Sequence, residues 1–243
     1  MSKKDSQLEL FGSKSVVTFA PEEARAGFEH VTQRDIGIPT LVKLEKNSRY
    51  LDPDNKDYTP VEGAEKGNVL LTPANTLYKS GAQVVPFGYC RSWTEMKPRG
   101  AGGGFVASHM APPVESSTIE VQGRNVLVMP NGNELKETAT FGVLVRSAEG
   151  DWTPAVVRMQ GMSLRTARQW INIALATGKP LYASGYTLSA EADKNELGSF
   201  QVWKVILLGA IQSQELADRA KEQHALFSRV FMGAATPVVE EAY

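Results

Sequence analysis

The stretch Gln83-Val-Val-Pro-Phe-Gly-Tyr-Cys-Arg-Ser-Trp-Thr-Glu-Met96 decides the fold class. It is rich in β-branched and aromatic side chains, which suit the pleated surface of a strand, and turn residues precede and follow it. Shorter runs of the same kind occupy residues 69–72 and 76–79. The pattern predicts that the middle of the chain is β-structure.

Two hairpins are expected downstream of this stretch. Residues 137–146 alternate between apolar and polar, and residues 152–159 pair naturally with them across a short turn. Residues 181–190 and 199–208 form a second such pair. Because the strands come in runs, we expect an antiparallel sheet in a β-rich α+β fold. The simplest candidate is a Greek-key barrel of the oligonucleotide-binding (OB) kind, with added helices.

Residues 163–177 are the clearest helix. Leu164, Ala167, Ile171 and Ala174 recur at helical spacing and form one apolar stripe. Ser163 is the expected N-cap, and the glycine at position 178 stands where a left-handed C-terminal cap belongs.

The chain divides, on this interpretation, into four segments. A flexible N-terminal segment covers residues 1–20, although residues 21–30 resemble a short helix with proline in its first turn. The β-rich domain covers residues 21–210. A C-terminal helix within residues 211–232 serves packing or oligomerisation, and residues 233–243 form a disordered, weakly acidic tail.

Composition gives broad limits. Apolar residues make up 42% of the chain and charged residues 22%, which is ordinary for a globular protein. The formal net charge is −1, so any positive surface must be local. The single cysteine, Cys90, lies in an apolar run and is expected to be buried, which fits a reducing compartment. The N-terminal sequence lacks the apolar core of a signal peptide, so we expect a cytoplasmic protein.

Recognisable catalytic motifs are missing from the sequence. The three histidines are far apart, and no C-x-x-C pair, Walker loop or G-x-S-x-G elbow occurs. These observations predict a protein that is not an enzyme and has no metal or cofactor. A catalytic site assembled only by the fold remains an alternative.

An aromatic and basic strand is the first candidate for binding. By the period of two, Phe87, Tyr89, Arg91 and Trp93 share one face, and aromatic faces stack on unpaired bases while cations hold phosphates. The glycine-rich loop that follows adds further candidates, namely Lys97, Arg99 and Phe105. The alternative is that the aromatic residues belong to the core and the charges are simply solvated.

A charge imbalance is the second candidate. Residues 152–190 hold four cations and no acid, and Arg158, Arg165 and Arg168 could contact a nucleic-acid backbone. Lys43 and Lys46, in and after the first strand, are a third candidate. A solvated helix face and a solvated loop are the alternatives.

The chain also resembles a group of tailed-phage proteins. The resemblance rests on residues 27–41, 62–68 and 84–89, on Pro98-Arg-Gly-Ala-Gly-Gly-Gly-Phe-Val106, and on residues 154–170 and 198–203. Some members look like phage single-stranded-DNA-binding proteins, and the chain is similar also to the single-stranded-DNA-binding RNA polymerase cofactors of lytic podoviruses. The resemblance transfers no defined set of contact residues.

The resemblance implies binding of single-stranded DNA (ssDNA), homo-oligomerisation and a role in phage replication or transcription. It also implies a place in the host cell cytoplasm and an RNA polymerase, of the phage or the host, as a further partner. The residues themselves suggest binding without strong sequence preference, through stacking and phosphate contacts. Two rival functions stay open, a structural or assembly protein of the virion and a polymerase-binding regulator.

Overall fold

The computed structural model describes residues 38–98, 103–121, 123–195 and 198–229. The chain divides into two units, Met1–Gly37 and Ile38–Tyr243, and all described residues belong to the second. The expectations for residues 1–20, for a helix at residues 21–30 and for the tail at residues 233–243 therefore lie outside the described residues.

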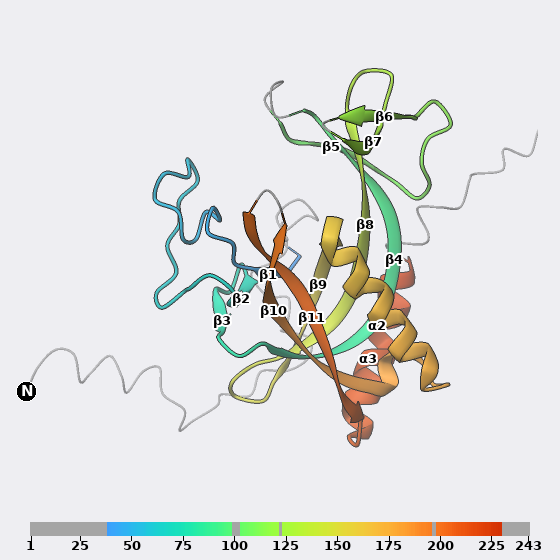
Figure 1. The fold of residues 1–243 in the computed structure, drawn as a ribbon. Coiled ribbons are helices and arrows are strands. Elements are labelled where there is room, and N and C mark those ends of the chain that lie inside the picture. The colour runs from blue at the N-terminus through green and yellow to red at the C-terminus, as the bar shows by residue number, and fades with distance from the viewer. Residues whose placement is uncertain (1–37, 99–102, 122, 196–197, 230–243) are drawn as a thin grey trace, which may run out of the picture. The chain divides into compact units, whose positions relative to one another are not determined.

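The described part of the chain contains eleven strands and two α-helices (Figure 1). The strands are β1 (Thr40–Lys43), β2 (Val69–Thr72), β3 (Thr76–Tyr78), β4 (Ala82–Met96), β5 (Phe105–His109), β6 (Ser117–Val121), β7 (Arg124–Val128), β8 (Glu134–Arg146), β9 (Trp152–Gln160), β10 (Ser184–Asn195) and β11 (Gly198–Ala210). The helices are α2 (Leu164–Ala176) and α3 (Gln214–Phe227), and two single 3-10 turns cover Gly161–Ser163 and Leu181–Ala183.

All eleven strands belong to one curled sheet, whose main path is β11-β10-β4-β8-β9-β1-β2-β3. The expected hairpins are confirmed, since β8 pairs with β9 and β10 pairs with β11 in antiparallel fashion. The expectation of a wholly antiparallel sheet was wrong, because β1 lies parallel to β9, with Thr40 opposite Val156. No turn joins these two strands, so no local signal in the sequence announced their pairing.

The inner face of the sheet packs against α2. Phe141 of β8 stacks on Trp170 of α2, with ring centroids 4.3 Å apart, and Trp170 meets the edge of Tyr186 from β10. Trp170 and Tyr186 are fully buried. The helix predicted at residues 163–177 is thus confirmed and covers the main core, and Gly178 has the expected positive φ of 64°. Ser163, however, makes no side-chain cap hydrogen bond.

The outer face packs against α3 in a second apolar cluster. Phe227, near the end of α3, meets Phe87 of β4 edge to face at 5.9 Å. Gly88 and Gly142 lie directly opposite each other on β4 and β8, and a Cβ atom on either would overlap the ring of Phe227. The two glycines therefore create the space that the ring fills, and α3 is held against the sheet there.

β11 approaches β1 at the other side of the curled sheet. The carboxylate of Glu45, which follows β1, accepts the backbone N–H of Gln201 in β11 through both oxygens, at 3.0 and 3.1 Å. A side chain thus bridges the two strands where no backbone ladder joins them. Within the residues described, no helix has the length and apolar character needed to cross a membrane.

Candidate nucleic-acid interface

The aromatic residues of β4 do not all share one face. The ladder between β4 and β8 shifts register between Pro86 and Gly88, which adds one residue to β4 at Phe87. Phe87 therefore turns to the outer face and α3, while Tyr89 turns to the inner face and packs on Phe141 at 5.1 Å. Both rings belong to hydrophobic clusters, as the alternative interpretation of the sequence held.

Arg91 and Trp93 lie on the inner face beyond the core, and acidic side chains lie next to them. Arg91 is paired with Glu137, Nε to Oε1 at 3.1 Å. Trp93 is half-buried, and His109 and Glu137 lie opposite it on the two neighbouring strands. Glu95, the next residue on this face, is also an acid. The cations here are therefore largely neutralised, which disfavours this face as a surface for phosphates.

Glu95 is a buried polar contact point whose side chain is only 6% exposed. Its carboxylate accepts hydrogen bonds from the side-chain amides of Asn133, at 2.5 Å, and Asn131, and it lies 2.9 Å from Nε2 of His109. The hydrogen bond from Asn133, with that to His109 next, lowers the pKa of Glu95 below its ordinary value despite the opposing effect of burial. Glu95 thus ties β5 and the turn before β8 to the end of β4.

A trough lies on the outer face of β4, β8 and β9, next to the area that α3 covers. We call it the outer trough, and its cavity volume is about 510 Å³. It is lined by Cys90, Ser92, Thr94, Phe105, Ser108, Met110, Thr138, Thr140, Arg158 and Gln160. Of the site residues predicted from the sequence, the structure brings Phe105 and Arg158 together here.

The floor of the outer trough is a row of hydroxyl and amide groups across three strands. The hydroxyls of Thr94 and Thr138 are 2.9 Å apart, and the amide of Gln160 donates to the Thr138 hydroxyl at 2.8 Å. Such bonded polar side chains hold fixed orientations and can offer further donors and acceptors to a ligand. No signal in the sequence indicated this floor, since its residues come from separate strands and are common on any sheet.

The walls of the outer trough supply one cation and two apolar groups. Arg158 is exposed, and no ion pair or hydrogen bond engages its side chain within the residues described. Phe105 is 66% exposed and Met110 is 42% exposed. No acid is among the described residues that line the trough, and none of them pairs with Arg158.

Cys90 lines the trough on the side next to α3 and is buried, as the sequence predicted. Burial raises the pKa of its thiol above the ordinary value, so the group is protonated at neutral pH. Its Sγ lies 3.9 Å from Sδ of Met110. This thiol is therefore a packing group rather than a nucleophile.

The other predicted site residues lie elsewhere. Arg165 and Arg168 belong to α2 on the inner face, and Arg165 is 3.6 Å from Asp193. Lys43 is paired with Glu45. Lys46 and Lys97 are exposed, and Arg99 lies outside the described residues. The acid-free stretch therefore does not form one basic surface, because the sheet separates Arg158 from α2.

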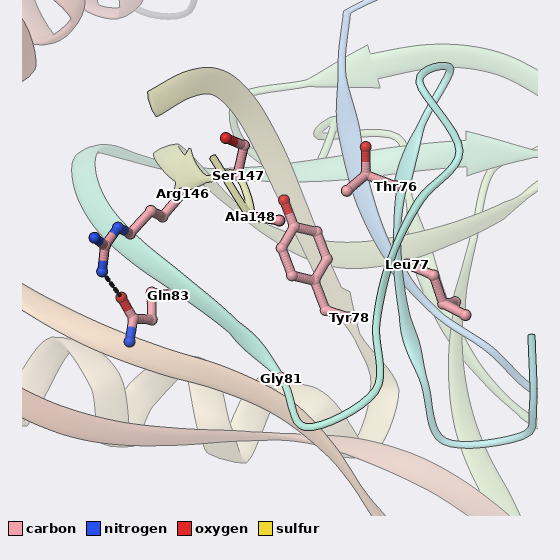
Figure 2. A pocket seen from close by; sticks show the side chains of 8 residues that line it. All are labelled: Thr76, Leu77, Tyr78, Gly81, Gln83, Arg146, Ser147 and Ala148. Carbon is pink, nitrogen blue, oxygen red and sulfur yellow. Dashed lines mark hydrogen bonds between the residues drawn. The ribbon is translucent and has the colours of Figure 1, made fainter. Parts of the chain in front are cut away.

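A second hollow, which the sequence did not indicate, has a volume of about 350 Å³ and is shown in Figure 2. There Nη1 of Arg146 donates to the side-chain oxygen of Gln83 at 3.0 Å. The hydroxyl of Tyr78 is turned toward the turn at Ser147 and Ala148, and burial, with a contribution from Glu149, raises its pKa. Arg146 is thus already engaged, and the ring of Tyr78 packs on the core. This hollow is therefore a weaker candidate for a binding site than the outer trough.

Among the residues described, no group of three or more His, Cys, Asp or Glu side chains is placed to hold a metal ion. No curated protein and no solved structure matches the chain at a significant level. One family model does match, over residues 7–230, and that range includes every strand and helix described above. The chain therefore belongs to the family of Pam3 phage gp34-like proteins.

Proposed function

We propose that this protein binds single-stranded DNA in the outer trough, without strong sequence preference, and acts in phage replication or transcription. The observation that carries the proposal is the set of groups that line the trough. An exposed aromatic ring, Phe105, and an unneutralised cation, Arg158, stand on either side of a polar floor. Those are the groups that non-specific ssDNA sites combine.

The order of strands supports an OB-like site. Strands β10-β4-β8-β9 have the spatial order 4-1-2-3 of a Greek key, and β11 lies beside β10. OB-folds bind oligonucleotides on the face of their second and third strands, with help from the connection between the first and second. The equivalent elements here are β8, β9 and the β4–β8 connection, which carry Thr138, Arg158 and Phe105. The arrangement differs in that β1, rather than β11, pairs with β9.

The chemistry of each group fits a role. A base stacked on Phe105 would gain about 1–3 kcal/mol, and Arg158 would contact a phosphate. The hydroxyls of Thr94 and Thr138 would offer hydrogen bonds to sugars or base edges. No cofactor is needed for this binding.

The proposal is tested by fluorescence anisotropy with labelled ssDNA of about 20 nucleotides at low salt, about 50 mM. Phe105→Ala and Arg158→Ala are each expected to weaken binding by about tenfold, in line with a loss of ~1.4 kcal/mol. Leu175→Ala and Arg168→Ala change exposed residues of α2 on the inner face and are the matched controls. They are expected to leave the affinity within about twofold.

Two results would contradict the proposal. One is failure of the wild-type protein to bind ssDNA at low salt. The other is equal losses in the trough variants and the α2 controls, which would place the DNA elsewhere. Parallel titrations with duplex DNA and RNA identify the preferred nucleic acid.

A protein-binding role is the second candidate, and one observation favours it. The β4–β8 connection exposes several apolar side chains, namely Val106, Val114, Ile119 and Val121. Surfaces of this kind bind proteins. A phage or host RNA polymerase, or a virion component, is the expected partner in that case, and a pull-down with purified polymerase distinguishes it from ssDNA binding.

A further inference from the structure

Half of the outer edge of β11 is already capped by side chains. One edge of this strand pairs with β10, and no other strand lies along the opposite edge in the described part of the chain. The N–H of Gln201 is bound by Glu45. The carbonyl of Trp203 accepts from the hydroxyl of Thr166 at 2.6 Å, and its N–H lies 3.5 Å from Ser163 Oγ. These contacts engage the N–H of Gln201 and both outward-facing backbone groups of Trp203.

The second half of the edge has no such caps. Backbone groups alternate in direction along a strand, so Val205 and Leu207 face outward as Gln201 and Trp203 do. In the residues described, no side-chain or loop hydrogen bond reaches their outward groups. The same segment exposes large apolar side chains, with Ile206 48%, Leu207 43% and Leu208 56% exposed. Residues 205–211 contain no charge and no proline, the devices that usually protect an edge.

We propose that a second copy of this chain pairs with this edge, strand β11 against strand β11, antiparallel about a two-fold axis at Ile206. In this register the outward groups of Val205 face those of Leu207 in the other copy, so each donor meets an acceptor. This register uses only uncapped groups, whereas a shift toward Gln201 would require displacement of the side chains that cap Trp203.

The side chains fit the same register. Lys204 of one copy is aligned with Leu208 of the other, the extra residue where the β10–β11 ladder shifts register, and its ammonium group keeps Glu191 at 3.0 Å. A register centred on Lys204 would instead place two like charges opposite each other, which is unfavourable. The alignment centred on Ile206 avoids this repulsion.

Apolar surface next to the edge extends the contact. A groove of about 250 Å³ beside Leu208 is lined by Val85, Trp152, Ile211 and Leu216, with other residues of the loop before α3. β10 separates β11 from β4, the first strand of the outer trough. The inference therefore does not depend on the proposed ssDNA site, and either can fail alone.

The oligomeric state of the full-length protein tests the proposal. Light scattering coupled to gel filtration is expected to show a dimer at micromolar concentration, and Ile206→Glu is expected to give a monomer, because two carboxylates would meet on the axis. Leu175→Glu is the matched control, since it adds the same charge at a leucine of α2 that is 72% exposed. Circular dichroism of each variant confirms that it is folded.

A cross-linking variant tests the register itself. Ile206→Cys places a thiol on the axis, in a pair whose Cα atoms approach to about 4.5 Å, and should form a disulfide-linked dimer on mild oxidation. Leu208→Cys should not, because its counterpart lies four residues away along the partner strand, and the wild-type protein, with Cys90 buried, should not either. A monomeric wild type at roughly 100 µM would overturn the proposal. A dimer that Ile206→Glu leaves intact, or equal cross-linking of both variants, would also overturn it.

Discussion

The ring of Phe227 occupies space that Gly88 and Gly142 leave open on the outer face of the sheet. Gly88→Ala is expected to lower the free energy of unfolding by about 1–3 kcal/mol, because the new methyl group must displace the ring. Urea denaturation measures the loss. Phe227→Leu in the same chain should recover part of it, since the smaller side chain leaves room for the methyl group.

Gly185→Ala is the matched control for this substitution. A Cβ atom at Gly185 would meet only the carbonyl oxygen of Val84, at 4.0 Å. We expect Gly185→Ala to change the free energy of unfolding much less than Gly88→Ala does. Equal losses in the two variants would mean that the general cost of replacing glycine, and not the contact with Phe227, determines the effect.

For single residues, the sequence predicted burial and exposure better than the face of the sheet on which a side chain lies. Cys90 is buried as expected, and the exposed Phe105 and Arg158 meet in one trough. The prediction that Phe87 and Tyr89 share one face was wrong, because one extra residue at the bulge reverses the alternation of side chains. A bulge is set by how two strands fit together, and the sequence of one strand does not reveal it.

Among the elements, β5 is joined to the end of β4 by a backbone ladder and, in addition, by the contact between the side chains of Glu95 and His109. Hydrogen bonds lower the pKa of Glu95, so its contribution to stability is present above the ordinary pKa of glutamate and is lost as the pH falls through the lowered value. We expect Glu95→Gln to unfold more readily than the wild type at neutral pH. The difference should close as the solution is acidified, because the wild-type carboxylate then becomes protonated.

Thermal unfolding followed across this pH range measures the difference. Glu120→Gln, a change at an exposed glutamate of β6, should follow the wild type at every pH. Amide hydrogen exchange in β5 locates the effect, and Glu95→Gln should accelerate it there first. A pH-independent gap between Glu95→Gln and the wild type would show that the ionised carboxylate is not what holds β5.

The elements that the sequence predicted are those joined by short connections. The hairpin of β8 and β9 and helix α2 follow from alternation, helical spacing and the glycine at position 178. The pairing of β1 with β9 was not predictable in this way, since it joins distant parts of the chain in parallel. The OB-like Greek-key arrangement was inferred from the number of strands and their succession in runs, and it stays a proposal.

For the whole molecule, the net charge of −1 and the one free cation among the described residues of the outer trough, Arg158, predict that ssDNA affinity depends only weakly on salt concentration. If one or two phosphates are neutralised, the plot of log K against log salt concentration should have a slope between about −0.7 and −1.4. Arg158→Ala should flatten the slope by about 0.7, whereas Phe105→Ala should lower affinity and leave the slope unchanged. A slope steeper than about −3 would indicate a larger basic surface outside the trough.

The candidate site was only partly predictable because it is a property of the whole sheet. Its floor takes Thr94, Thr138 and Gln160 from three strands, and none of them stands out in the sequence. The basic stretch at residues 152–190 was a real imbalance of charge. The fold nevertheless places Arg158 on one face of the sheet and the arginines of α2 on the other.

The parallel pairing of β1 with β9 also has a consequence for synthesis on the ribosome. β1, β2 and β3 emerge early and can form their own antiparallel ladder, since their pairings are local. The other edge of β1 can pair only once β9 has been synthesised, after β4 to β8. During that interval the nascent chain presents Leu41, which is buried in the finished fold, to solvent and to chaperones. The yield of native protein should therefore depend more strongly on translation rate than it does for a protein built only of simple hairpins.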